Sequence, residues 1–257
     1  MNDRAAHSIA AMRRAQDELA VLVATLTPEQ LATPSASAEW SVADVLSHLG
    51  SAAENNLRTL IDGAADMAAN QPVWDRWNAM TPQDQANNCV IFGDQLVQAF
   101  ESLDEEARLH RTIDLGFLPM PVDIAFFADM RLSEMALHRW DVEVPFDDSA
   151  KVSDYLVPVV LDRLPLFAGF FAKPIGTARR IGISVEDPDR EYVLELTTEG
   201  GLLTEGASGN VDANASLPAE AFVRLTAGRL DPKHTPPGVE VTGAVSLDDL
   251  RTVFPGY

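Results

Sequence analysis

The sequence predicts a mixed fold, with an N-terminal four-helix bundle followed by a small α+β C-terminal domain. Apolar residues recur at helical spacing through the first half of the chain, and a strand-like alternation of apolar and polar residues begins near residue 180. The stretch 145–150 lies between the two patterns and is the expected boundary region. We therefore expect one domain at residues 1–147 and a second at residues 148–257.

The first half contains four segments with the apolar spacing of a helix. In the second segment, Ser41 is a suitable N-cap, and Asp44 stands three residues later as the acidic member of a capping box. A loop with Gly116, Pro119 and Pro121 precedes the fourth segment. Helices of this number and length suffice for a four-helix bundle, and such bundles build metal sites from side chains that point inward. The expected helices span residues 3–25, 41–61, 82–109 and 122–142.

The second half starts with one more helical segment, in which Pro158 and Pro165 predict a kink or a break. Two alternating segments then flank residues 187–190, Asp-Pro-Asp-Arg, which are typical of a hairpin turn. The glycine-rich stretch 200–210 predicts turns. Helices mixed with antiparallel strands indicate a small α+β domain. The expected elements are a helix at 151–171, strands at 180–185, 191–197, 213–217 and 239–243, and helices at 218–227 and 246–254.

Composition narrows the class of protein. Acidic residues outnumber basic ones by 39 to 19, a net charge of −20, so the chain should repel phosphate backbones and nucleic acid is not an expected partner. No stretch reaches the roughly 18 uninterrupted apolar residues of a membrane-spanning helix. The one cysteine, Cys89, excludes an internal disulfide and fits a reducing compartment. With no signal-peptide pattern at the N-terminus, we expect a cytoplasmic protein, as a monomer or a homodimer.

Two of the expected helices carry residues that can bind a metal. Glu134 and His138 are four residues apart, so both side chains leave the same face of a helix. His48 stands among apolar residues of another helix and should point inward. If these helices pack together, two imidazoles and a carboxylate converge and leave coordination positions open, as in a catalytic metal site. Zinc suits these ligands, and so do iron(II) and nickel.

Simpler interpretations of the same residues exist. A single core histidine is more often hydrogen-bonded than metal-bound, and Glu134 with His138 is also the spacing of a solvated ion pair. The apolar residues around this pair favour the metal, because an unpaired buried carboxylate costs several kcal/mol and a cation offsets that cost. Asp141 is placed to orient an imidazole from behind, or to act as a charge near the helix end; Asp44 has the simpler role of a cap.

The sequence offers no nucleophile of its own. Cys89 has no basic neighbour in sequence to lower its pKa, and we interpret it as a core residue. Phosphate-binding and dinucleotide-binding glycine motifs and the serine hydrolase motif are absent from the sequence.

The metal-binding segments resemble those of a known family. Residues 40–49, Trp-Ser-Val-Ala-Asp-Val-Leu-Ser-His-Leu, preceded by residues 26–31, Leu-Thr-Pro-Glu-Gln-Leu, look like the start of the mycothiol-dependent maleylpyruvate isomerase family, within the DinB-like superfamily. Residues 134–141, Glu-Met-Ala-Leu-His-Arg-Trp-Asp, look like its second metal motif, in which many DinB-like proteins have histidine in place of Glu134. Residues 225–229 and 239–243 are similar to its sterol-carrier-like C-terminal domain.

The resemblance implies a DinB-like metal-binding bundle that uses His48, Glu134 and His138, and it implies mycothiol, a low-molecular-weight bacterial thiol, as cofactor. A divalent metal would lower the pKa of the bound thiol. In an isomerase the thiolate would add to a conjugated cis double bond, allow rotation and leave. In the alternative, a mycothiol S-transferase, it would displace a leaving group or open a ring. An iron oxygenase and a non-enzymatic metal- and thiol-binding module are further alternatives.

Arg229 is the candidate catalytic residue outside the metal ligands. It matches a Gly-Arg pair of the family's second domain that could bind a substrate carboxylate in a bidentate manner, and its alternative role is an exposed charge at a helix end. We expect the second domain to close over the metal face and supply this contact. Arg131 and Arg139 flank the metal motif, and we expect the helical phase to point them away from the ligands. The sequence does not identify the mycothiol-binding residues or the substrate.

Overall fold

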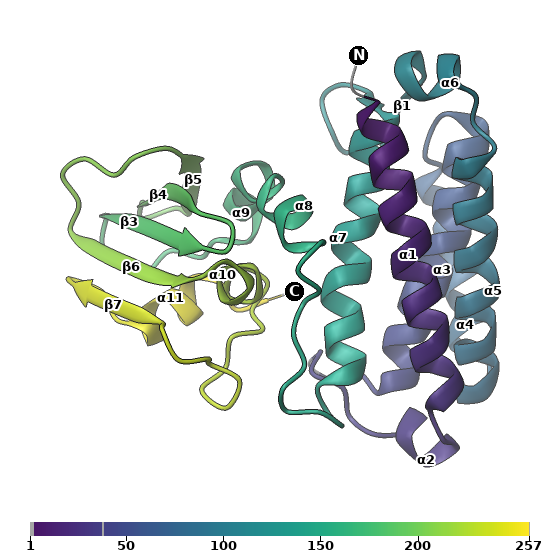
Figure 1. Ribbon diagram of the computed structural model, residues 1–257, viewed down its shortest axis with the longest axis horizontal. Coiled ribbons are helices and arrows are strands. Elements are labelled where there is room, and N and C mark those ends of the chain that lie inside the picture. The colour runs from purple at the N-terminus through teal and green to yellow at the C-terminus, as the bar shows by residue number, and fades with distance from the viewer. Residues whose placement is uncertain (1–2, 38, 257) are drawn as a thin grey trace. The chain divides into compact units, whose positions relative to one another are not determined.

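The computed structural model describes residues 3–37 and 39–256 and divides the chain into two compact units, 1–150 and 151–257. Within the described part of the first unit, the four longest helices form a bundle (Figure 1). Helix α1 packs against α5 and α7, and α3 packs against the same two, so the four helices close a ring. The predicted four-helix bundle is confirmed. These helices are α1 (Arg4–Thr25), α3 (Val42–Asp62), α5 (Pro82–Glu101) and α7 (Ile124–Glu143).

Shorter elements connect the bundle helices, and most of them were not anticipated. The expected third helix is wrong in its extent, because α5 ends at Glu101 and Asp104 caps a separate helix through the amide of Ala107. Residues 112 and 113 of the expected loop form a strand, and it pairs antiparallel with residues 122 and 123, which were expected to begin the fourth helix. The connecting elements are α2 (Pro28–Leu31), the 3₁₀ helix η1 (Met67–Ala69), α4 (Asn70–Asn78), α6 (Glu105–His110), β1 (Thr112–Ile113) and β2 (Val122–Asp123).

Helices α3 and α7 run in opposite directions. The C-terminal end of α3 is tied to the segment after β1, where the Asp114 amide donates to the Gly63 carbonyl at 3.0 Å and the Ala65 amide donates to the Asp114 carbonyl at 2.8 Å. Strand β1 pairs with β2, and α7 starts directly after β2. The last turn of α3 therefore lies near the first turn of α7. Residues closer to the C-terminal end of α3 lie level with residues closer to the N-terminal end of α7.

Helix α4 docks on α3 at a glycine. A Cβ atom at Gly50 would lie 2.2 Å from the ring of Trp77, so only glycine allows this approach. The Trp77 indole is fully buried and its Nε1 donates to Glu54 of α3 at 2.8 Å. This contact fixes α4 against the helix that carries His48.

The second unit contains a five-stranded sheet in the order β5-β4-β3-β6-β7 (Figure 1). The predicted hairpin is confirmed, since β3 and β4 pair antiparallel with Ile183 opposite Tyr192. The sheet is not purely antiparallel as expected, because β3 and β6 are parallel. The strands are β3 (Arg179–Glu186), β4 (Arg190–Leu196), β5 (Gly201–Glu205), β6 (Ala213–Pro218) and β7 (Glu240–Gly243).

Two further corrections concern this unit. Strand β5 occupies part of the stretch that was expected to form turns, and it pairs with β4. The expected helix over 151–171 starts later and is broken, with Pro158 and Pro165 each at the start of a short helix, so the predicted break is confirmed. Helices α10 and α11 agree with the expected segments. The helices are α8 (Val157–Leu161), α9 (Leu164–Phe171), α10 (Ala219–Thr226) and α11 (Leu247–Val253).

Among the described residues, no helix has the length and apolar character needed to cross a membrane.

Candidate metal centre

His48 is positioned by the first two turns of α3. The Asp44 amide donates to Ser41 Oγ at 3.2 Å, and the Ser41 amide donates to Asp44 Oδ2 at 2.9 Å, which completes the predicted capping box. The recorded hydrogen bonds of the Asp44 carboxylate go to Ser41, so Asp44 acts as a cap and does not orient His48. His48 lies two turns into the helix, with 34% of its side chain exposed.

Glu134 and His138 lie one turn apart in the second half of α7. The helix is fixed at its start by Asp123, whose carboxylate accepts from the Phe126 amide at 2.6 Å. Asp129 ties α7 to α1, because its carboxylate accepts from Ser8 at 2.6 Å and from Arg4 at 2.8 Å. These bonds set the rotation of α7 that turns Glu134 and His138 toward α3.

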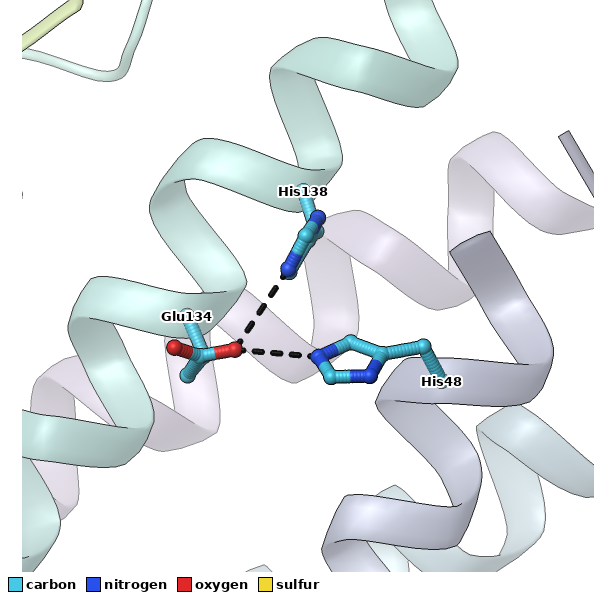
Figure 2. A group of neighbouring side chains, drawn as sticks. All are labelled: His48, Glu134 and His138. Carbon is cyan, nitrogen blue, oxygen red and sulfur yellow. Dashed lines mark hydrogen bonds and ion pairs between the residues drawn. The ribbon is translucent and has the colours of Figure 1, made fainter. Parts of the chain in front are cut away.

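The structure brings the three predicted ligands together. Glu134 Oε2 lies 3.1 Å from His48 Nε2 and 3.4 Å from His138 Nε2, as Figure 2 shows. One donor atom from each residue falls in a group whose members lie within 4.8 Å of one another. Two imidazole nitrogens and one carboxylate oxygen at this spacing are a donor set for a divalent cation.

Asp141 supports His138 from the side away from Glu134. The Asp141 carboxylate lies 2.8 Å from His138 Nδ1 and is fully buried. A proton on Nδ1 satisfies this contact and leaves a lone pair on Nε2. His138 Nε2 is buried, and apart from the Glu134 carboxylate at 3.4 Å it has no hydrogen-bond partner among the described residues. A buried imidazole nitrogen whose lone pair faces a carboxylate oxygen is suited to bind a cation together with that carboxylate, so the residues fit a divalent metal.

Electrostatics favour the ionised form of Glu134. Burial would raise the pKa of its carboxyl, but hydrogen bonds with His138 and His48 outweigh burial and hold that pKa well below its ordinary value. Burial would lower the pKa of His138, yet the contacts with Asp141 and Glu134 raise it overall. Glu134 therefore offers a negative charge at any pH near neutrality, which is what a cation site requires.

The Trp40 ring lies beside the rings of the two histidines. Its ring centroid lies 5.2 Å from that of His48 and 6.2 Å from that of His138. The residue directly precedes the Ser41 cap, so the turn into α3 sets its position. Trp40 belongs to the sequence motif 40–49 but was not predicted to line the site, and its place just before a helix that carries a ligand was the available signal.

Of the two arginines that flank the metal motif, Arg139 lies where it was expected and Arg131 does not. Arg139 points away from the ligands as predicted, because it pairs with Glu18 and Glu143. The expectation for Arg131 is wrong: its spacing of three from Glu134 and seven from His138 puts it on their face of the helix, and it is 2% exposed. Cys89 is buried as expected, and burial raises its pKa to about 12.

Arg229 lies in the second unit, directly after the turn that ends α10. It is 6% exposed, so it is not the exposed surface charge that was its alternative role. Its Nη1 donates to the Ala227 carbonyl at 2.8 Å, and its amide donates to the Arg224 carbonyl at 2.7 Å.

Residues 12–143, just over half of the chain, match the family described as the mycothiol maleylpyruvate isomerase N-terminal domain. The matched segment contains all three candidate metal ligands and Asp141. No curated protein sequence matches the chain.

Two solved structures share the fold over nearly the whole chain. The crystal structure of the mycothiol-dependent maleylpyruvate isomerase matches with a TM-score of 0.68 at 13% identity, covering 94% of this chain and 95% of that one. A histidine-to-alanine mutant of the mycothiol-dependent maleylpyruvate isomerase matches with a TM-score of 0.64 at 14% identity and the same coverage. At these identities the likeness extends to the fold of both units, and the chemistry has to be argued from the residues.

Proposed function

Because this chain belongs to the mycothiol maleylpyruvate isomerase N-terminal domain family, we propose that it is a metal-dependent enzyme that uses mycothiol as its thiol cofactor. The proposed substrate is a small electrophile that carries a carboxylate, and the proposed reaction is the isomerisation of a conjugated cis double bond. The observation that carries the proposal is the group formed by His48, Glu134 and His138, with donor atoms within 4.8 Å of one another.

The proposed metal is a divalent ion, with zinc the first choice for two imidazoles and one carboxylate, and nickel and iron as the other options. When bound, such an ion lowers the pKa of a coordinated thiol, so that a thiolate is available at neutral pH. Three protein ligands leave a coordination position for that thiol.

The residues around the ligands have distinct tasks. Asp141 holds the proton on His138 Nδ1, which keeps the lone pair of Nε2 directed at the ligand group. Glu134 supplies the negative charge that partly balances a divalent ion. Trp40 shields one side of the two imidazoles from bulk water. Cys89 stays protonated in the core, so the chain itself supplies no competing thiolate.

Arg229 remains the proposed catalytic residue of the second unit, on the strength of the family resemblance. Arg229→Lys keeps the charge and loses the planar pair of donors. If Arg229 binds the substrate, this variant keeps its fold and metal and loses activity. Kinetics unchanged in both Arg229→Lys and Arg229→Ala would remove Arg229 from the site.

The test combines metal analysis, thiol titration and turnover on the whole chain. We expect about one divalent ion per chain in the wild type and in His110→Ala, a control in which an exposed histidine is removed, and little in His48→Ala or His138→Ala. Calorimetry with mycothiol should show binding that depends on the metal. Turnover of maleylpyruvate then supports the isomerase. Turnover only of other electrophiles points instead to thiol transfer, and equal metal content in all variants contradicts the site.

A further inference from the structure

Arg131 is a buried cation whose terminal nitrogens form no hydrogen bond within the described part of the chain. The residue is 2% exposed and is among the largest fully buried side chains of the described chain. Its two terminal nitrogens, Nη1 and Nη2, have no hydrogen-bond partner among the described residues. A guanidinium stays protonated in proteins, and an uncompensated buried charge is strongly unfavourable. The donors on these two nitrogens are therefore not used by any described residue.

The position of Arg131 connects it to the candidate metal centre. It lies three residues before Glu134 and seven before His138, on the same face of α7 and about 4.5 Å from Glu134 along the helix axis. Because α3 and α7 are antiparallel, Arg131 lies level with the part of α3 that follows His48. Glu134 of its own helix and Cys89 of α5 both interact electrostatically with Arg131, so its side chain extends into the interior of the bundle.

Neither neighbour neutralises this charge. The Glu134 carboxylate is engaged by the two imidazoles, at 3.1 Å and 3.4 Å, and forms no ion pair with Arg131 among those found in the described chain. The Cys89 thiol is protonated near neutral pH, because burial raises its pKa to about 12. The strong desolvation of the Arg131 guanidinium lowers its own pKa.

We propose that Arg131 is the carboxylate-binding residue of this site and holds a carboxylate of the substrate beside the metal. The planar guanidinium offers two parallel N–H donors that match a carboxylate, and in a buried position such a pair is strong and directional. The proposal rests on the proposed function and deepens it, since it names the residue that binds the substrate carboxylate. It also places a substrate-binding cation within the helical unit itself, in addition to Arg229 of the second unit.

The experiment uses the full chain, with and without zinc, and maleate as a small dicarboxylate probe. Arg131→Met keeps the bulk of the side chain and removes the charge, and Arg131→Lys keeps the charge and removes the fork. Arg139→Met is the matched control, on the same helix but paired with Glu18 and Glu143. Calorimetry gives the Kd for maleate and for its uncharged dimethyl ester, thermal unfolding gives the Tm, and metal analysis gives the zinc content.

We expect maleate to bind about 10- to 100-fold more weakly to Arg131→Met than to the wild type, with an intermediate loss in Arg131→Lys. Arg139→Met should bind maleate like the wild type, and the dimethyl ester should not distinguish the variants. Because the unpaired charge is removed, Arg131→Met without ligand should have an equal or higher Tm, and its zinc content should be unchanged.

Three results would overturn the proposal. The first is equal maleate affinity in the wild type and Arg131→Met, and the second is no maleate binding by the wild type with or without zinc. The third is a Tm several degrees lower in Arg131→Met, which would show that Arg131 has a structural role. If Arg131→Met does not fold, equal maleate affinity in Arg131→Lys and the wild type contradicts carboxylate binding by the two parallel N–H donors of the guanidinium. A wild type that holds no zinc would contradict the proposed function, while the titration of the zinc-free protein would still test Arg131.

Discussion

Arg131 of the helical unit and Arg224 of the sheet unit are buried to the same degree, at 2% and 3% exposed, but only one is paired. Arg224 donates from Nε and Nη2 to the two oxygens of Glu220, at 2.7 Å and 2.9 Å, and from Nη1 to the His234 carbonyl at 2.8 Å. The terminal nitrogens of Arg131 have no such partner in the described chain. The Arg224 charge is satisfied within the fold, and the unused donors of Arg131 are the reason for proposing that it binds a ligand.

The largest effect should come from breaking the paired arginine. Arg224→Met leaves the Glu220 carboxylate without its cation in a largely buried place, and we expect a loss of about 3–5 kcal/mol in the stability of the sheet unit. Hydrogen exchange of the amides in β3 and β6 measures this loss locally. Arg180→Met, which removes an exposed arginine of β3, should change stability by about 1 kcal/mol or less. An equally large loss of bundle stability in Arg131→Met would contradict the proposed difference between the two arginines.

Cys89 gives a second way to test the surroundings of Arg131. With a pKa of about 12 in the folded chain against 9.0 for an unperturbed thiol, its thiolate at pH 8 is about a thousandfold scarcer in the native protein. Alkylation by iodoacetamide at pH 8 should therefore be about a thousandfold slower than in denaturant. Because the folded chain holds this proton more tightly, its stability should fall as the pH rises from 9.0 toward about 12. Rapid alkylation of the native protein would indicate that Arg131 is paired with a thiolate.

Asp141 should affect the metal more moderately. Asp141→Asn keeps a side chain that can contact His138 Nδ1 and removes the charge, so the expected loss of zinc affinity is about 10- to 100-fold. Competition with a zinc-binding dye measures this affinity. Asp44→Asn is the matched control on α3, where the carboxylate serves the helix cap, and it should leave the zinc affinity unchanged. Equal affinities in wild type and Asp141→Asn would return Asp141 to the role of a helix-end charge.

The parts of this account that the sequence predicted are those with local signals. The capping box of Ser41 and Asp44 fixed the start of α3, and the spacing of Glu134 and His138 put both on one helical face. Their convergence with His48 could be predicted only if the two helices pack together, since it depends on how α3 packs on α7. Arg131 was assigned to the wrong face because it was judged as a neighbour of the motif, although its spacing from both ligands is helical.

The elements that sequence reasoning missed depend on contacts with distant residues. Strand β5 buries only Leu203 and exists through its pairing with β4, for which the glycine-rich sequence gives no sign. Helix α4 buries only Val73 and Trp77 among its residues, and the space for Trp77 comes from Gly50 on another helix. Helix α2 had a local signal that was not used, since Thr27 and Gln30 form a capping box and Pro28 occupies the first turn.

The central claim is that two of the five histidines, His48 and His138, hold one divalent ion with Glu134, and ¹⁵N NMR of the imidazole rings tests it most directly. On addition of zinc we expect the Nε2 signals of His48 and His138 to shift and to saturate at one equivalent, while His138 keeps its proton on Nδ1. The other histidines should not respond. Signals of His48 and His138 that stay in place with zinc present, or a response confined to the exposed histidines, would contradict the account.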